Sequence, residues 1–393
     1  HDLRLYHNDV PIPCGLKEGE KPPSREIEVP VRLVPNRNRF YVMASQEGAF
    51  DSRSEEFEVD YVGPMEPGRL HVVALGVGDY QKRRLQYAQR DAERLSEVLH
   101  DRGLDKLGQF GLRILLPDAQ VTQEKVEQAF DDIAKSVENR PQDTVVIFMA
   151  GHTGVFEGQK FGLLLPTFPF PADAPILVAA RGAALNQGEL KVDPKYVLPY
   201  SLVALNLMRL KALNRFVIVD ACQADAILDD PQVRSLQKWM EVSSRRVRTS
   251  YVFAARRGEE SLEADPLRHG ILTYALLRGL GAVPLADEPK AIADLGLPIN
   301  ADFNKDGILS NDELIAYAKE VLPQINDIFP KLVTDARAAL PRGNAPVVPR
   351  RNPEQQKLER ERLEQATRLQ SSESSFPLVP LTIQRPRLPV ARP

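Results

Sequence analysis

Hydrophobic positions follow two different patterns along this chain. Up to about residue 66, short segments rich in Val, Phe and Tyr alternate with polar positions, and helical spacing is absent. From residue 69 onward, continuous apolar runs of strand length alternate with longer segments whose apolar residues recur at helical spacing. The first pattern predicts a small all-β segment, and the second predicts βαβ units that build a mostly parallel sheet flanked by helices.

The same patterns give boundaries for these parts. The all-β segment, 1–66, is expected to form a small or partial Ig-like sandwich that ends in the Pro-Gly linker GPMEPG. The α/β domain is expected over 69–285. Its predicted strands include 70–77, 111–117, 160–166 and 249–256, and its predicted helices are 83–103, 121–139, 201–213 and 269–280.

Two further apolar runs each end in a small residue followed by a reactive side chain. TVVIFMAGHTG (144–154) brings His152 to the end of one predicted strand, and FVIVDACQAD (216–225) brings Cys222 to the end of another. Open α/β sheets place their chemistry at the carboxyl ends of such strands. A thiolate is the attacking species, and a neighbouring imidazole can generate it near neutral pH. Either residue alone is usually an ordinary core residue, but together they favour a nucleophile and its base.

Composition and charge narrow the classes of function. The 51 Lys and Arg residues nearly balance the 54 Asp and Glu residues, so we expect neither a nucleic acid nor a membrane as partner. No apolar stretch approaches the ~20 residues that span a bilayer. The first residues, HDLRLYHNDVPIP, lack the basic and apolar regions of a signal peptide, and two Cys in different contexts do not indicate a disulfide framework. We therefore expect a cytoplasmic location rather than a secreted one.

Four pieces of the chain occur in an order that is typical of one family. They are HVVALGVGDY (71–80), AGH (150–152), DAC (220–222) and HGILTYALLRGL (269–280). In this order they resemble the caspase-like cysteine peptidases of clan CD, and among these the chain looks closest to the bacterial metacaspases. The resemblance implies a caspase–haemoglobinase-like α/β fold and hydrolysis of peptide bonds through a Cys–His dyad. Cys222 would be the nucleophile, and His152 the general base and acid.

The resemblance also implies the groups that bind the substrate. The backbone N–H groups of Cys222 and Thr153 would form the oxyanion hole, although relatives commonly have Gly in place of Thr153, which leaves room for reduced activity. Asp91, in QRDAERL, and Asp220 would line the primary pocket. Two carboxylates imply a cationic substrate side chain, with Arg favoured over Lys because its planar fork binds carboxylates in a bidentate manner. The alternative for Asp91 is an exposed charge on the helix surface.

Four arginines lie in the segment between the strand that ends at Cys222 and the next predicted strand. We expect this segment to be a surface loop or a loose helix, which makes the arginines candidates for self-cleavage. The alternative is that they are simply solvated charges. They are Arg234, Arg245, Arg246 and Arg248.

A twelve-residue segment after the α/β domain, DFNKDGILSNDE (302–313), fits the Ca²⁺ loop of an EF-hand. Gly307 occupies the position of the sharp turn, and ELIAYAKEVLPQI supplies the exiting helix. The entering side contains Pro298, so we expect half of an EF-hand pair within 296–325; the alternative is a loop with a purely structural role. Ca²⁺ is the expected cofactor, with no organic cofactor. Its expected ligands are Asp302, Asn304, Asp306, Ile308 through its carbonyl, Ser310 and Glu313.

The last part of the chain, 341–393, is rich in proline and is expected to be largely disordered. This tail and the all-β segment are candidate surfaces for a protein partner. The leading hypothesis is a cysteine endopeptidase, influenced by Ca²⁺, that cuts protein or peptide substrates after Arg or Lys. Two alternatives remain open: a catalytically weak or inactive caspase-like scaffold, and a calcium-regulated structural protein.

Overall fold

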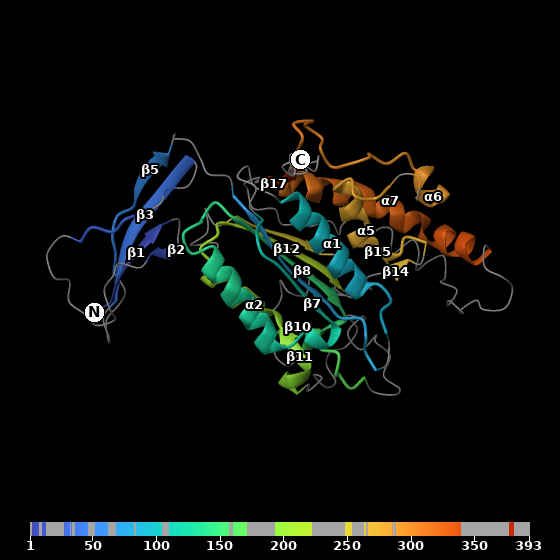
Figure 1. Ribbon diagram of the computed structural model, residues 1–393, viewed down its shortest axis with the longest axis horizontal. Helices are drawn as coiled ribbons and strands as arrows, with labels where there is room; N and C mark the ends of the chain where they lie inside the picture. Colours follow the sequence, from blue (N-terminus) through green and yellow to red (C-terminus); the bar gives the residue numbers. More distant parts are fainter. Residues whose placement is uncertain are drawn as a thin grey trace, which may run out of the picture.

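The centre of the protein is a five-stranded parallel sheet with helices on both faces (Figure 1). The computed structural model describes residues 2–7, 10–12, 27–31, 33, 36–45, 52–61, 68–81, 84–103, 110–156, 160–170, 193–221, 248–253, 263–264, 266–284, 286, 288–338 and 377–380. The strand order is β13-β12-β8-β6-β7, and every neighbouring pair is parallel. The strands are β6 (Leu70–Gly76), β7 (Arg113–Pro117), β8 (Thr144–Gly151), β12 (Asn214–Ala221) and β13 (Arg248–Phe253). The predicted fold class is confirmed.

The central strands are apolar because helices cover both of their faces. All residues of β6 and β8 are buried, as expected for strands in the middle of a parallel sheet. One layer consists of α1 (Ala88–Arg102), α5 (Ile271–Gly279) and α7 (Asn311–Ala338). The other layer contains α2 (Gln123–Ser136) and α3 (Tyr200–Arg209). In Figure 1 the first layer lies above the sheet and α2 lies below it.

Alternate residues of each strand face the two layers. In β12, Phe216 and Ile218 pack with the layer of α1, α5 and α7, whereas Val217 and Val219 pack with the layer of α2 and α3. Successive side chains of a strand point to opposite faces, so Asp220 follows Phe216 and Ile218 to the side of α1 and α5. This alternation decides which helices surround the pocket carboxylate predicted at Asp220.

The strands β8 and β12 reach the carboxyl edge of the sheet at the same level. Their register pairs Asp220 with Ala150 and Ala221 with Gly151. His152 follows directly after β8, and position 222 follows directly after β12. The two apolar runs therefore end side by side, as expected for a site at the carboxyl ends of the strands.

The helix boundaries follow from local capping. Thr122 Oγ1 accepts a hydrogen bond from the N–H of Lys125 at 3.2 Å, which confirms the predicted start of α2. Helix α1 begins at Ala88 rather than near residue 83, and it ends at Gly103 as predicted. A Cβ atom on Gly103 would approach Leu70 Cβ to 2.6 Å, so glycine lets the end of α1 lie close against β6.

A separate antiparallel sheet of three strands adjoins the end of β8. Its order is β11-β10-β9, with β9 (Thr153–Phe156), β10 (Lys160–Leu164) and β11 (Val197–Pro199). The strand predicted at 160–166 thus exists, but it belongs to this small sheet. Two short 3₁₀ helices, η1 (Asp118–Gln120) and η4 (Pro194–Tyr196), follow β7 and precede β11.

The N-terminal part forms one antiparallel sheet in the order β2-β1-β3-β4, with β5 also paired to β3. Rings of His7, Phe40 and Phe57 stack across it, with centroids 4.5 Å and 5.2 Å apart. A sandwich would need a second sheet, which the described residues of 2–61 do not form, so the sandwich stays a prediction. The strands are β1 (Asp2–His7), β2 (Val10–Ile12), β3 (Asn36–Ser45), β4 (Ser52–Arg53) and β5 (Phe57–Tyr61).

Short elements complete the C-terminal part, namely α6 (Lys290–Ala293), β14 (Glu263–Ala264), β15 (His269–Gly270), β16 (Ile308–Ser310) and β17 (Pro377–Pro380). Strand β17 comes from the tail that we expected to be largely disordered. It pairs with β16, and Leu378 is only 7% exposed in the main core, so burial and pairing order this piece despite its proline content. Among the described helices, none is long and apolar enough to cross a membrane.

Candidate active site

The backbone around His152 is shaped by a glycine and a tyrosine. Gly151, the last residue of β8, has φ +154°, a conformation that side chains disfavour. A Cβ atom there would lie 2.9 Å from the hydroxyl of Tyr80 and 2.8 Å from Leu163 Cδ1. Glycine therefore allows Tyr80 to approach the chain immediately before His152.

Tyr80 connects His152 to the neighbouring small sheet. Its hydroxyl accepts a hydrogen bond from the backbone N–H of His152 at 2.9 Å and donates one to the carbonyl of Leu164 at 3.0 Å. The N–H of Leu164 donates to the carbonyl of His152 at 2.8 Å. The pair His152–Leu164 thus has one direct hydrogen bond, and the tyrosine hydroxyl bridges the other N–H and carbonyl, which fixes the backbone that carries the imidazole.

Aromatic rings surround the imidazole of His152. The Tyr80 ring lies 4.8 Å from it in a tilted arrangement, and the Phe170 ring meets it edge-on at 5.4 Å. His152 is 8% exposed. The rings restrict the rotamers of the imidazole, which is what a base needs in order to meet a nucleophile in one orientation.

The N–H of Thr153 is directed away from β10. Residues 152 and 164 form a hydrogen-bonded pair of the β9–β10 ladder, and Thr153 is opposite Leu163 in the next pair. Hydrogen-bonded and non-hydrogen-bonded pairs alternate along antiparallel strands, so the Thr153 amide points to the opposite side. The β9–β10 ladder therefore does not use the Thr153 amide.

Asp220 is fixed by the first turn of α5. Its Oδ2 atom accepts hydrogen bonds from the hydroxyl of Thr273 at 2.6 Å and from the N–H of Thr273 at 3.2 Å. The amino end of a helix favours a negative charge. Asp220 is 6% exposed, so this carboxylate lies inside the protein, beside the end of β12.

Asp91 reaches the same place from α1. Its Oδ1 atom lies 2.5 Å from Nδ1 of His269, and its Oδ2 atom accepts a hydrogen bond from the N–H of Gly270 at 2.8 Å. Asp91 is 2% exposed, which excludes the alternative of an exposed charge on the helix surface. The two predicted pocket residues, Asp91 and Asp220, are hereafter called the carboxylate pair.

Gly270 shows how near the two carboxylates are. A Cβ atom on Gly270 would lie 2.7 Å from Oδ2 of Asp220 and 3.1 Å from Oδ2 of Asp91. The two oxygens can be no farther apart than the sum of these two distances. Burial lowers the pKa of His269 to about 4, and the charges of Arg90 and Arg94 act in the same direction. The ring is therefore neutral at pH 7, and its single N–H can serve Asp91.

The remaining predicted active-site residues are only partly described. Cys222, the expected nucleophile and second oxyanion donor, lies outside the described residues, as do the self-cleavage candidates Arg234, Arg245 and Arg246. Arg248 was expected in the connecting segment, but it is the first residue of β13 and is opposite Asn214 in β12. Because β13 extends the core sheet, Arg248 is not part of the expected loop.

With this geometry established, comparison with known proteins decides the family. A family model for the caspase domain matches residues 69–292, more than half of the chain. The chain belongs to this family. No curated protein is similar enough to count as a match. Membership of the caspase-domain family implies cysteine peptidase chemistry on protein or peptide substrates, and it assigns the parallel sheet and its helices to that domain.

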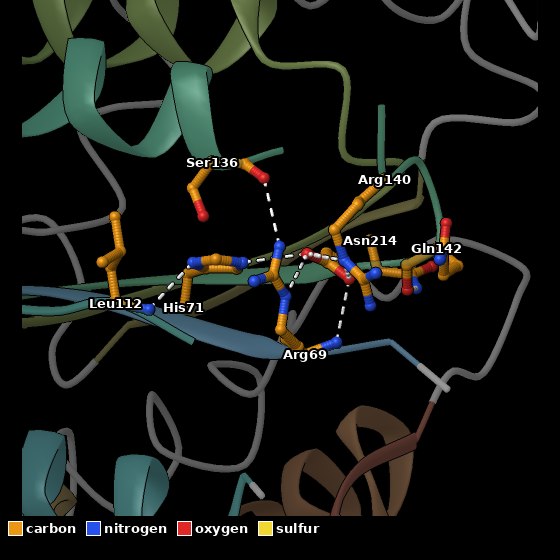
Figure 2. A network of polar contacts seen from close by, with 8 residues as sticks. Arg69, His71, Leu112, Ser136, Arg140, Gln142 and Asn214 are labelled. Atoms are coloured by element: carbon orange, nitrogen blue, oxygen red, sulfur yellow. Dashed lines mark hydrogen bonds and ion pairs between the residues drawn. The ribbon is translucent and has the colours of Figure 1, made fainter. Parts of the chain in front are cut away.

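A second buried polar cluster lies at the opposite, amino ends of the strands (Figure 2). Asp143 accepts hydrogen bonds from Nε of Arg140 at 3.0 Å and from the backbone N–H of Arg69 at 2.9 Å. Nε2 of His71 lies 3.0 Å from Asp143 Oδ2, while Nδ1 of His71 accepts from the N–H of Leu112 at 3.0 Å. The proton of the neutral imidazole is therefore on Nε2. Asp143, His71, Arg69 and Arg140 are hereafter called the Asp143 cluster.

The predicted calcium loop is folded around its own oxygens. Asp302 accepts hydrogen bonds from the N–H groups of Asp306, at 3.2 Å, and Gly307, at 3.1 Å. Glu313 accepts from the N–H of Ser310 at 3.0 Å and from the N–H of Asn304 at 3.5 Å. The N–H of Ile308, in β16, donates a hydrogen bond to Oδ1 of Asp306 at 2.8 Å. Over the described residues, no group of three or more His, Cys, Asp and Glu is placed to hold a metal ion, so calcium binding stays a prediction.

Four residues of the site were missed by reasoning from the sequence. His269 and Gly270 belong to a two-residue strand, Thr273 lies inside an apolar helix, and Tyr80 follows β6 in a short polar stretch. They act through hydrogen bonds and close approaches to residues distant in sequence, which no periodic pattern records. The only available signal was the family resemblance, because Tyr80 and His269 both lie inside the matching pieces.

Proposed function

We propose that this caspase-domain protein is a cysteine endopeptidase of the metacaspase kind, as in bacteria, that cuts after Arg and less efficiently after Lys. The observation that supports a specificity for Arg is the carboxylate pair. Two buried carboxylates within a few ångströms repel each other, and a cation between them relieves that repulsion. The guanidinium of an Arg side chain supplies such a cation and can bond both carboxylates through its planar fork.

In the proposed reaction Cys222 is the nucleophile and His152 moves the proton. The imidazole takes the thiol proton, and the sulfur attacks the carbonyl carbon of the scissile bond. His152 then gives the proton to the leaving amine as the C–N bond breaks, which leaves a thioester. A water molecule, deprotonated by His152, hydrolyses the thioester, releases the carboxylic acid and restores the thiol.

The proposed oxyanion hole consists of the N–H groups of Thr153 and Cys222. Its support is the direction of the Thr153 amide, which points away from β10, and the level at which β8 and β12 end. Donors of this kind typically contribute about 3 kcal/mol to the stabilisation of the transition state. Thr153 restricts the backbone more than the Gly that is common in relatives, so we expect modest turnover.

A profile of cleaved peptides tests this proposal. The purified full chain is incubated with a peptide library that varies the residue before the cut, with Cys222→Ala as the control. We expect cleavage after Arg, weaker cleavage after Lys, none after Asp, and no cleavage by Cys222→Ala. A preference for Asp or for apolar residues would overturn the specificity. A folded protein without any turnover would favour the inactive scaffold.

Self-processing follows from the same specificity. The candidate cut sites are Arg234, Arg245 and Arg246, whereas Arg248 is a weaker candidate because a peptidase needs an extended and accessible chain, and this residue begins β13. Intact-mass measurement of the wild type against Cys222→Ala decides the matter. Fragments that end at one of these arginines and depend on Cys222 are expected, and their absence would exclude processing.

We also propose that the loop 302–313 binds Ca²⁺ and stabilises the protein. The support is chemical: its side chains offer carboxylate, amide and hydroxyl oxygens at the spacing of an EF-hand, and Ca²⁺ prefers oxygen ligands. Binding to the folded state alone raises the free energy of unfolding with ligand concentration. The melting temperature should therefore rise with calcium, with an affinity of roughly 10⁻⁵–10⁻³ M. Glu313→Gln should remove the shift; no shift in the wild type at millimolar calcium would exclude the site.

A further inference from the structure

His269 and Gly270 occupy the position where α1, β12 and α5 meet. They form β15, which pairs with β14 and leads directly into α5. Gly270 is the residue before the first turn of α5, and Thr273 of that turn holds Asp220. The two residues thus connect Asp91 of α1 to Asp220 of β12 through one short segment of backbone.

We propose that His269 and Gly270 are positioning residues for specificity, because they fix the carboxylate pair in the arrangement that distinguishes an Arg side chain from a Lys side chain. This inference rests on the proposed function. In this proposal His269 and Gly270 determine the geometry of the pocket, and the carboxylate pair supplies the charge of the pocket.

The first support is that both oxygens of Asp91 are held by neighbours in sequence. His269 binds Oδ1 at 2.5 Å, and the N–H of Gly270 binds Oδ2 at 2.8 Å. Two bonds from adjacent residues determine both the position and the plane of the carboxylate. A planar guanidinium depends on that plane, whereas an ammonium is close to a point charge and tolerates a rotated carboxylate.

The second support is the close approach of Gly270 to both carboxylates. Its φ of −60° suits any residue, so the backbone conformation does not require glycine. Space does, because a Cβ atom would lie 2.7 Å from an oxygen of Asp220 and 3.1 Å from one of Asp91. A methyl group at position 270 must therefore displace one or both carboxylates while leaving β15 and the helix cap intact.

The third support is that His269 is a neutral donor at the operating pH. Its side chain is 12% exposed and that of Asp91 is 3% exposed, so water competes little for their contact. A neutral imidazole adds no positive charge beside Asp91, whereas a lysine or arginine at position 269 would. The residue type thus fits a group that orients a carboxylate without cancelling its charge.

The test compares two fluorogenic peptides that differ only in Arg or Lys before the cut. The ratio of their kcat/KM values is measured for the wild type, Gly270→Ala, His269→Leu and His269→Asn. We expect Gly270→Ala and His269→Leu to lower the Arg-to-Lys ratio about tenfold, since hydrogen bonds to charged groups contribute on that order. His269→Asn should keep most of the ratio, because its amide N–H can replace Nδ1–H.

A matched control separates positioning from general damage to α5. Gly279→Ala places a methyl group at the other end of the same helix, 2.9 Å from Tyr317 Cδ1 and 3.0 Å from Leu314 Cδ1, away from the carboxylate pair. It should change the melting temperature without changing the Arg-to-Lys ratio. An equal change of the ratio in Gly279→Ala and Gly270→Ala would overturn the proposal, and so would an unchanged ratio in His269→Leu.

A binding measurement distinguishes failure of this inference from failure of the proposed function. Benzamidine, a planar cation that resembles an arginine side chain, is titrated by calorimetry into Cys222→Ala with and without Gly270→Ala or His269→Leu. Binding that these changes weaken, in a protein without turnover, would support the pocket and reject the peptidase. Turnover with an unchanged ratio would reject this inference alone. Absence of both turnover and binding would reject both.

Discussion

The two ends of the parallel sheet each hold a histidine beside a buried carboxylate, and they differ in the groups that contact the carboxylate. In the Asp143 cluster, Arg140 contacts the carboxylate with its guanidinium, and Arg69 adds a second guanidinium contact at 3.3 Å (Figure 2). At the carboxylate pair, the hydrogen bonds from His269, Gly270 and Thr273 come from neutral groups. The contacts described at Asp143 thus include two cations, whereas those described at the carboxylate pair are hydrogen bonds from neutral donors.

The pKa of Asp143 reflects this difference. Burial alone would raise it, but hydrogen bonds from His71 and from the backbone N–H of Arg69, together with the charge of Arg140, lower the pKa below its ordinary value. A carboxylate with a lowered pKa stabilises the folded protein when ionised. The Asp143 cluster thus stabilises the sheet, whereas the carboxylate pair is, in the function proposed above, the binding site for the cationic side chain of the substrate. If the proposed function is correct, the charge of the neighbouring groups, more than burial, separates a structural cluster from a binding site.

The largest expected effect on stability comes from Asp143→Asn. This change leaves two guanidinium groups without their shared anion, and breaking a buried ion pair costs about 3–5 kcal/mol. We expect the lower end of this range, because the side chains of Arg69 and Arg140 are 17% and 15% exposed and regain some water. Urea denaturation measures the loss. Asp131→Asn, which removes an exposed ion pair with Arg209, is the control and should cost less than ~1 kcal/mol.

Asp220→Asn should reduce activity while sparing stability, in contrast to the loss of stability expected for Asp143→Asn. The free energy of unfolding should stay the same or rise, because the change relieves repulsion within the carboxylate pair. The value of kcat/KM for an Arg peptide should fall by the equivalent of about 2–5 kcal/mol, the usual cost of deleting a buried charge partner. If Asp220→Asn instead loses as much stability as Asp143→Asn and keeps its specificity, the two ends of the sheet are not different in kind.

The parts of the fold that could be predicted from the sequence are those that a repeated pattern specifies. Strands β8 and β12 are continuous apolar runs because both of their faces are covered, and Thr122 marks the start of α2 by its capping bond. Strand β17 could not be predicted, since four residues rich in proline carry no strand pattern and are ordered by pairing with β16.

Of the candidate site, too, only some residues could be predicted from the sequence. The sequence predicts His152 and position 222 as site positions because each comes directly after an apolar run. The register of β8 and β12 places the ends of these two strands at one level. Asp91 and Asp220 are far apart in sequence, and only the family resemblance connects them. In the structure they meet because side chains alternate along β12, which directs Asp220 to the face of the sheet on which α1 packs. The groups that hold them act through contacts between distant segments, and such contacts have no local signature.

The two ends of the sheet should contribute to the pH dependence of stability in different pH ranges. The pKa of His269 is about 4 in the folded protein and near 6.5 when unfolded, so the unfolded state binds more protons between these values. The free energy of unfolding should therefore fall as the pH drops from 6.5 to 4, and His7, whose pKa burial also lowers, adds to the fall. Asp143 has a lowered pKa, so its contribution is present above pH 3.8 and is lost as the pH falls through its folded-state pKa.

Two variants assign these two regions of the pH profile. His269→Asn should flatten the profile between pH 6.5 and 4, and Asp143→Asn should flatten it below pH 3.8. Chemical denaturation at a series of pH values gives the profile. A wild-type profile that rises as the pH falls from 6.5 to 4 would mean that His269 gains a proton on folding, and the carboxylate pair would then be partly neutralised from within the protein.

The smallest expected effect comes from Tyr80→Phe, which tests how His152 is held at the carboxyl ends of the strands. The change keeps the ring that lies 4.8 Å from His152 but removes the hydroxyl that bridges the N–H of His152 and the carbonyl of Leu164. The loss of these hydrogen bonds should cost about 1–2 kcal/mol of stability. Because the bridge fixes the backbone of the base and does not touch the substrate, kcat should fall several-fold while KM stays constant. Steady-state kinetics with an Arg peptide, and the rate at which iodoacetamide labels Cys222, measure the effect. A raised KM with an unchanged kcat would show that Tyr80 supports the pocket rather than the base.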